Sequence, residues 1–227
     1  MPRWTRSPTS IRPRCARACW PSTTATPCPR GVRRSRACWP EWPSRAAAST
    51  CRWREMTRYV IGIGSNIDPA RNVPAVLEAL CERFGTVAVS RIVHTRPVHM
   101  DTERDFYNLA VLIETDLDEA ALKAVCNAIE IGRGRDRADP DSRCKDRPAD
   151  LDILFVVDGT AGERARAMDE PYYRETVLDL LASTGDIEAG AELSYPVVSL
   201  RVGSDTLGEA PATIHRQART GDVGVVE

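Results

Sequence analysis

The sequence predicts an α+β fold built from strands and helices in the order β-α-β-β-α-β. Two observations lead to this prediction. Short segments rich in β-branched and aromatic residues, which suit strands, alternate with segments in which apolar residues recur every three or four positions, as on one face of a helix. The chain of 227 residues is also long enough to bury a real hydrophobic core.

The first strand and helix follow one another directly. Residues 58–63 (RYVIGI) are apolar and β-branched, and residues 64–66 (GSN) end this strand with a turn. Pro69 suits the first turn of a helix, where its missing N–H costs nothing. Apolar residues then recur at helical spacing until Gly85, which is typical of a helix end.

Two strands, a helix and a last strand complete the pattern. Residues 86–95 (TVAVSRIVHT) are expected to form the second strand, and a polar loop over residues 96–105 leads to the third, residues 106–115 (FYNLAVLIET). Asp118 is a plausible N-cap for the second helix, and residues 149–157 (ADLDILFVV) form the last strand. This order predicts a ferredoxin-like antiparallel sheet with both helices on one face.

The remainder of the chain carries weaker signals. Residues 175–182 (ETVLDLLA) are expected to form a short helix, and residues 186–227 an irregular C-terminal tail with little apolar periodicity. The predicted folded domain therefore covers residues 56–185.

Residues 1–55 differ in composition from the rest. They hold all five Trp, twelve Arg and five of the eight Cys, but only two acidic residues. Frequent Pro and the lack of a regular period argue against stable structure, and the Cys lack the paired spacing of a zinc site. We expect a disordered basic arm or a mis-annotated extension, with translation starting at Met56; a transit peptide is a further alternative.

Composition excludes several classes of protein. No apolar run approaches the roughly 18 residues of a membrane span, which excludes a membrane protein. Cys81, Cys126 and Cys144 look like ordinary reduced thiols, so a cytoplasmic protein is expected. Residues 56–227 hold 19 basic and 30 acidic residues, a net charge of −11, which disfavours a nucleic-acid partner.

The candidate chemistry lies between residues 133 and 152. Asp150 and Asp152 alternate with Leu151, so in a strand both carboxylates point to one face. Two such carboxylates repel each other unless cations lie between them, and removing one could stabilise the protein by about 0.5 kcal/mol. Oxygen ligands of this kind suit Mg²⁺. Six basic residues precede the pair and could neutralise phosphates: Arg133, Arg135, Arg137, Arg143, Lys145 and Arg147.

A solvated loop and a polar strand face would explain the same residues without any ligand. The combination of motifs nevertheless resembles a known family. The chain shows GSN after the first strand, FYN in the third, IExxxGRxR at the end of the second helix and RPADLDIL at the last strand. This combination, over about residues 59–157, is similar to 6-hydroxymethyl-7,8-dihydropterin pyrophosphokinases, which have a ferredoxin-like fold.

The resemblance implies transfer of pyrophosphate from ATP to the pterin in folate biosynthesis. Asp150 and Asp152 would hold two Mg²⁺, and Arg135 and Arg147 would be catalytic together with them. The residues implied to bind ATP are Asn127, Glu130, Arg135, Arg137, Arg147, Ile153 and Tyr173. The residues implied to bind the pterin are Thr95, Pro97, Val98, Phe106 and Asn108. The expected partners are these two small molecules, and the expected state is a monomer or weak homodimer.

Two segments depart from the family pattern. Residues 144–146 (CKD) stand where an aromatic lid is common, and Tyr172 replaces a His, with Tyr173 keeping the next position. The alternative is therefore a divergent paralogue that binds ATP and Mg²⁺ without catalysis or uses another hydroxymethyl substrate.

Overall fold

Four predicted strands lie side by side in one antiparallel sheet in a computed structural model, which describes residues 55–97, 102–137, 139, 145–216 and 223–226. Strand β1 (Thr57–Ser65) lies between β4 (Phe106–Thr115) and β5 (Asp150–Val156), and β2 (Thr86–Val89) pairs with the far side of β4. The order β5-β1-β4-β2 is that of a ferredoxin-like sheet, so the predicted fold class is confirmed.

The two predicted helices pack on one face of this sheet. Helix α1 (Pro69–Phe84) begins at Pro69, and α2 (Glu119–Gly132) is capped by Asp118, whose side chain accepts a hydrogen bond of 2.8 Å from the N–H of Ala121. Alternate residues of β1 and β4 point into the core beneath these helices, among them Ile61, Ile63, Leu109 and Val111. Burial of this apolar face supplies the main driving force for folding.

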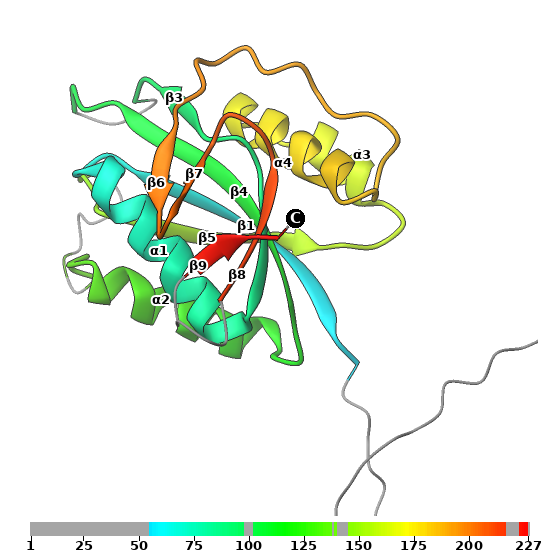
Figure 1. The fold of residues 1–227 in the computed structure, drawn as a ribbon, viewed down its shortest axis with the longest axis horizontal. Coiled ribbons are helices and arrows are strands. Elements are labelled where there is room, and N and C mark those ends of the chain that lie inside the picture. Colours follow the sequence, from blue (N-terminus) through cyan, green and yellow to red (C-terminus); the bar gives the residue numbers. More distant parts are fainter. Residues whose placement is uncertain (1–54, 98–101, 138, 140–144, 217–222, 227) are drawn as a thin grey trace, which may run out of the picture. The chain divides into compact units, whose positions relative to one another are not determined.

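The opposite face of the sheet is also covered, which the sequence prediction missed. Helices α3 (Ala161–Arg166) and α4 (Pro171–Ser183) lie on this side (Figure 1), where Val177 and Leu181 pack with Val60 and Leu112 in a second apolar cluster. The predicted helix over residues 175–182 is therefore part of a longer one. The prediction that helices cover one face only is corrected, because Val60 of β1 and Ala110 and Leu112 of β4 are apolar and buried on that side as well.

The single strand predicted for residues 86–95 is interrupted. After β2 the chain leaves the regular ladder at Ser90 and Arg91 and resumes as β3 (Val93–Thr95), which also pairs with β4. The side chain of Ser90 accepts a hydrogen bond of 2.9 Å from the N–H of Ala110, and the N–H of Arg91 donates to Asp179 of α4 at 3.1 Å. These two side-chain contacts replace ladder hydrogen bonds and produce the break.

The prediction of an irregular tail over residues 186–227 is wrong for much of that segment. Strands β6 (Leu200–Val202) and β7 (Asp205–Leu207) form a hairpin, while β8 (Ala212–Arg216) pairs with β2 and with β9 (Val223–Val225). Their apolar residues join the core beside α1. The strands are short and alternate apolar with polar residues, so they give little signal before their partner strands are known.

The prediction for residues 1–55 lies outside the described residues except for Glu55. All described residues belong to one compact unit, Arg52–Glu227. Among the described helices, none has the length and apolar content needed to cross a bilayer.

A first prediction concerns the C-terminal strands. Ile214 of β8 is 1% exposed, so Ile214→Ala should lower the free energy of unfolding by about 3 kcal/mol through a lost apolar contact and a cavity. Val226, 46% exposed, provides the control, and Val226→Ala should change stability by less than about 0.5 kcal/mol. Urea unfolding followed by circular dichroism measures both values. Equal, small effects would mean that β8 does not belong to the core.

Candidate active site

Two glycines of β1 make room for a site on the α4 face of the sheet. Gly64 pairs with Asp150 on one side and with Asn108 on the other, so these three residues form a row across three strands about 10 Å wide. A Cβ at Gly64 would lie 2.9 Å from Oδ1 of Asn108, and one at Gly62 would lie 2.7 Å from the Tyr173 ring. Side chains at either position would push into these neighbours, which explains why both residues are glycine.

The carboxylate of Asp150 lies between two guanidinium groups. Nη1 of Arg135 donates to one of its oxygens and Nη1 of Arg147 to the other. All three side chains are 10–15% exposed. Burial alone would raise the pKa of Asp150, but the two arginines hold this pKa below its ordinary value. Asp150 is therefore ionised at neutral pH. The cluster formed by Asp150, Arg135 and Arg147 carries one more positive charge than negative.

Asp152 follows on the same face of β5, opposite Gly62. Its side chain is 54% exposed and lies 3.0 Å from Nζ of Lys123, which also donates to the carbonyl of Leu151 at 2.8 Å. Lys123 was not among the residues predicted from the sequence. The spacing in the sequence could have identified it, since Lys123, Asn127 and Glu130 are separated by four and three residues and so share one face of α2.

Glu130 occupies a different place from the predicted one. It was expected to face the nucleotide, but its side chain is fully buried. Oε1 accepts the N–H of Leu151 at 2.8 Å, and Oε2 lies 3.1 Å from Arg135 and 2.6 Å from Arg137. Glu130 thus anchors the start of β5 and two arginines from inside the protein, because a buried carboxylate needs such partners.

The other residues predicted for ATP lie near this cluster. Oδ1 of Asn127 is buried and has no hydrogen-bond partner among the described residues, and the same holds for Nε of Arg135. Ile153 is partly exposed and lines a cavity of about 500 Å³ together with Lys123 and Asp152. Neither Asn127 nor Arg135 is among the residues that line this cavity. Their unpaired buried polar atoms are nevertheless groups that a ligand with matching donors and acceptors would satisfy.

Three of the residues predicted for the pterin, namely Thr95, Phe106 and Asn108, lie together on the other side of Gly64. Nδ2 of Asn108 donates to the hydroxyl of Thr95 at 2.8 Å, and both side chains are buried. Phe106 shares the face of Asn108, and its ring would lie 3.9 Å from a Cβ at Gly64. Pro97 is partly exposed. Val98 lies outside the described residues.

Two tyrosines at the start of α4 border the site. The rings of Tyr172 and Tyr173 are 4.7 Å apart, and that of Tyr173 lies over Gly62. Burial raises the pKa of Tyr172 to about 12 and that of Tyr173 well above its ordinary value, with Asp150 acting in the same direction on both. Both hydroxyls therefore remain protonated and can donate hydrogen bonds at neutral pH.

The short motif GSN also proves to have a defined structural role. The hydroxyl of Ser65 donates to the carbonyl of Pro148 at 2.7 Å, and the N–H of Asn66 donates to the carbonyl of Arg147 at 3.1 Å. The turn after β1 therefore holds the segment that enters β5.

Asp150 and Asp152 are suitable ligands for a divalent cation. Each carboxylate oxygen has a second lone pair beyond its contact with an arginine or lysine. Within the described ranges, no group of three or more His, Cys, Asp or Glu residues could hold a metal by itself. The two aspartates fit Mg²⁺, which usually takes one or two carboxylates and completes its shell with water and phosphate oxygens.

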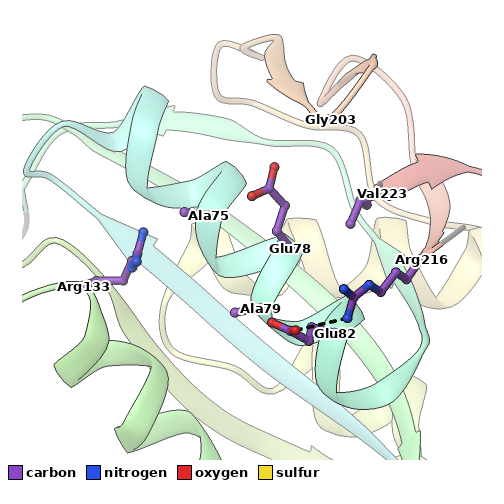
Figure 2. A pocket seen from close by; sticks show the side chains of 8 residues that line it. All are labelled: Ala75, Glu78, Ala79, Glu82, Arg133, Gly203, Arg216 and Val223. Atoms are coloured by element: carbon purple, nitrogen blue, oxygen red, sulfur yellow. Dashed lines mark hydrogen bonds and ion pairs between the residues drawn. The ribbon is translucent and has the colours of Figure 1, made fainter. Parts of the chain in front are cut away.

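A second cavity lies away from these residues. It has a volume of about 420 Å³ and is bounded by α1, the β6–β7 turn and strands β8 and β9 (Figure 2). Its charged lining includes an ion pair of 3.1 Å between Arg216 and Glu82. Arg133, one of the six basic residues noted in the sequence, lines this cavity, but none of the residues that the resemblance assigned to ATP or pterin does. We therefore place the candidate site at the row of Asp150, Gly64 and Asn108.

The fold and the cluster of acids and arginines define a small α+β enzyme of the kind that transfers phosphate-containing groups. Comparison with known proteins gives the family. The profile of 7,8-dihydro-6-hydroxymethylpterin-pyrophosphokinase matches residues 60–184, more than half of the chain. The chain therefore belongs to this family, and the resemblance seen in its motifs is confirmed.

Individual relatives agree with this assignment. A 2-amino-4-hydroxy-6-hydroxymethyldihydropteridine pyrophosphokinase of Methylorubrum extorquens is 32% identical over 162 residues, which cover 70% of this chain and 94% of the relative. A protein of the same name from Bacillus subtilis is 35% identical over 98 residues, 42% of this chain and 57% of that protein. The folate synthesis bifunctional protein of Arabidopsis thaliana is 28% identical over 74% of this chain and 36% of its own length.

A second prediction concerns Asp150. The sequence alone suggested that losing this charge could stabilise the protein, but the structure predicts the opposite, since Arg135 and Arg147 would lose their shared partner. Asp150→Asn should lower the free energy of unfolding at pH 7 by about 3 kcal/mol. Because the pKa of Asp150 is lowered by folding, the difference from wild type should persist down to about pH 4 and disappear at lower pH.

Urea unfolding between pH 2.5 and 7 measures this difference. Asp152→Asn is the matched control, because its more exposed ion pair with Lys123 should contribute less than about 1 kcal/mol. An Asp150→Asn protein as stable as wild type at pH 7 would contradict the role given to this carboxylate.

Proposed function

We propose that this chain transfers the β,γ-pyrophosphoryl group of ATP to the hydroxymethyl oxygen of 6-hydroxymethyl-7,8-dihydropterin. Membership of the family supports this proposal. The observation that carries it is the row across the sheet, in which the Asp150 cluster and Asn108 flank Gly64. Asp150 and its two arginines, which suit phosphate, thus lie in the same row as Asn108, which suits a heterocycle.

The reaction is a displacement at the β-phosphorus of ATP. A bond forms between the hydroxymethyl oxygen and this phosphorus, and the bond from the phosphorus to the oxygen of the α-phosphate breaks. AMP leaves, and the hydroxyl proton passes to solvent. Little covalent chemistry falls to the protein, so its contribution is positioning and neutralisation of charge.

Arg135 and Arg147 are the residues we assign to the phosphates. Their guanidinium groups are held in place before substrate arrives, by Asp150 in both cases and by Glu130 for Arg135. Donors fixed in advance need no reorganisation during the reaction, which is why they stabilise a transition state better than mobile ones. Arg137, paired with Glu130, is assigned a supporting contact with ATP.

Asp150 and Asp152 are assigned to two Mg²⁺. When bound, the ions would neutralise phosphate charge and polarise the phosphorus toward attack. The protein would supply two carboxylates on one face of β5 to hold these ions. In the apoprotein, Lys123 and the two arginines balance the charge of these carboxylates.

The remaining predicted residues are divided between the nucleotide and the pterin. Asn127, Ile153 and the Tyr173 hydroxyl are assigned to the nucleotide, and Thr95, Pro97, Val98, Phe106 and Asn108 to the pterin. The hydrogen bond between Asn108 and Thr95 fixes the amide, so that its Oδ1 points toward Gly64. An amide fixed in this way can recognise one edge of a heterocycle.

We also propose that the enzyme works in the cytoplasm on these two small molecules, as a monomer or weak homodimer. The state of two thiols supports a reducing compartment: Cys81 and Cys126 are both free and buried. Burial raises the pKa of Cys81 to about 12 and that of Cys126 to about 11.

A third prediction tests the proposed reaction. The full chain, incubated with ATP, Mg²⁺ and the hydroxymethyl-dihydropterin, should form AMP only when the pterin is present. Asp150→Ala and Asp152→Ala should each reduce the rate about 100-fold or more, through loss of charge stabilisation. Chromatography of the nucleotides measures AMP. Tight ATP binding without AMP would instead support the non-catalytic module, and AMP formation only with another alcohol would support the altered-substrate paralogue.

A fourth prediction tests the pterin half separately. In Gly64→Ala the new methyl group would displace the amide oxygen of Asn108. The KM for the pterin should rise roughly tenfold, equivalent to about 1.4 kcal/mol, with the Kd for ATP unchanged. Gly159→Ala serves as the control, since a Cβ there has no neighbour within 4 Å. A pterin KM equal to wild type in Gly64→Ala would place the heterocycle elsewhere.

A further inference from the structure

Asp146 joins three segments that are far apart in the sequence. One of its carboxylate oxygens accepts a hydrogen bond of 2.7 Å from Nδ2 of Asn66, which follows β1. The other oxygen lies 3.3 Å from Nε of Arg104, which precedes β4. Asp146 itself lies in the segment that enters β5, next to Arg147. No assignment made above gives Asp146, Asn66 or Arg104 a part in the reaction.

The contact with Asn66 determines how Arg147 is held. Oδ1 of Asn66 accepts the N–H of Arg147 at 2.7 Å, and the N–H of Asn66 donates to the carbonyl of Arg147 at 3.1 Å. A side-chain amide could turn by 180° and present its NH₂ group to Arg147 instead. A carboxylate can only accept, so Asp146 keeps the NH₂ group on its own side and the oxygen toward Arg147.

Asn66 is well suited to transmit this constraint. Its side chain is buried, with 3% of its surface exposed, so a wrongly oriented amide would leave buried donors and acceptors unpaired. Arg147, fixed at its N–H and its carbonyl, then directs its guanidinium to Asp150. The chain of contacts runs from Asp146 through Asn66 to Arg147 and the carboxylate at the start of β5.

Arg104 adds a link to the pterin side. Its side chain is 60% exposed and that of Asp146 29%, so the ion pair is solvated and contributes little to stability. Its position is informative, because Phe106 and Asn108 follow two and four residues later in the same chain segment. A single carboxylate thus contacts both the segment that carries Arg147 and the segment that leads to the pterin residues.

We propose that Asp146 is a positioning residue that orients Arg147 through Asn66, and that its contact with Arg104 ties the pterin segment to the phosphate segment. The effects on kcat and KM rest on the proposed function, because they require turnover of ATP and the pterin. The orientation of Arg147 also affects ATP binding directly, and this can be measured without turnover.

Three variants and a control separate the two contacts. Asp146→Ala removes both and should lower kcat/KM for ATP about tenfold through misplacement of Arg147. Asp146→Asn keeps an oxygen for Asn66 but loses the charge that attracts Arg104, so it should restore most of the ATP affinity. Arg104→Gln should raise the KM for the pterin and leave the Kd for ATP unchanged. Glu103→Gln, a neighbouring exposed acid, is the control and should match wild type.

Calorimetry with ATP and Mg²⁺, steady-state kinetics and thermal melting supply the readouts. Loss of ATP affinity in Asp146→Ala, with recovery in Asp146→Asn, supports the inference. Equal ATP affinity in Asp146→Ala and wild type overturns it, as does an equal loss in both Asp146 variants. If Asp146→Ala does not fold, an unchanged KM for the pterin in Arg104→Gln still overturns the proposed link between the pterin segment and the phosphate segment. A wild-type protein that binds ATP but forms no AMP would contradict the proposed function alone, since the ATP affinities still decide the role of Asp146.

Discussion

The pairing of Asp150 with two guanidinium groups is the interaction on which the site depends. Asp150 opens β5, and each of its oxygens accepts a hydrogen bond from a different arginine. Each arginine is fixed a second time, Arg135 by the buried Glu130 and Arg147 through its backbone by Asn66. The positive charge is therefore in place without a ligand. A preformed cationic site loses less conformational entropy when it binds an anion than one assembled from mobile side chains.

The sheet supplies the second constraint, because its register decides which groups lie side by side. Gly64 separates Asp150 from Asn108, and Gly62 gives space to Tyr173 of α4. Helix α4 covers the middle of this face, where its Val177 and Leu181 pack against Val60 and Leu112 of the sheet. The same strands that bury the core on one side thus present polar groups to a ligand on the other, and the rigidity of the core is passed to the site.

Local patterns in the sequence were sufficient to predict the central strands, the first two helices and the Asp118 cap. Features that depend on distant partners were missed. The break after β2 requires Asp179 of α4, and strand β8 requires the edge of β2. Glu130 was expected to face the nucleotide, because the sequence shows its motif but does not show that the side chain is buried. Motif spacing placed Asp150, Arg135 and Arg147 together, but the hydrogen bonds that fix Arg147 involve Asn66 and Asp146, which are 80 positions apart.

A crystal structure of the full chain with Mg²⁺, a non-hydrolysable ATP analogue and the pterin would test the central claim most directly. In such a structure, the guanidinium groups of Arg135 and Arg147 should bind phosphate oxygens while metal ions lie on Asp150 and Asp152. The pterin should lie across Gly64, beside Asn108. A triphosphate bound away from the two arginines, with Asp150 still enclosed between them, would show that this cluster only stabilises the fold.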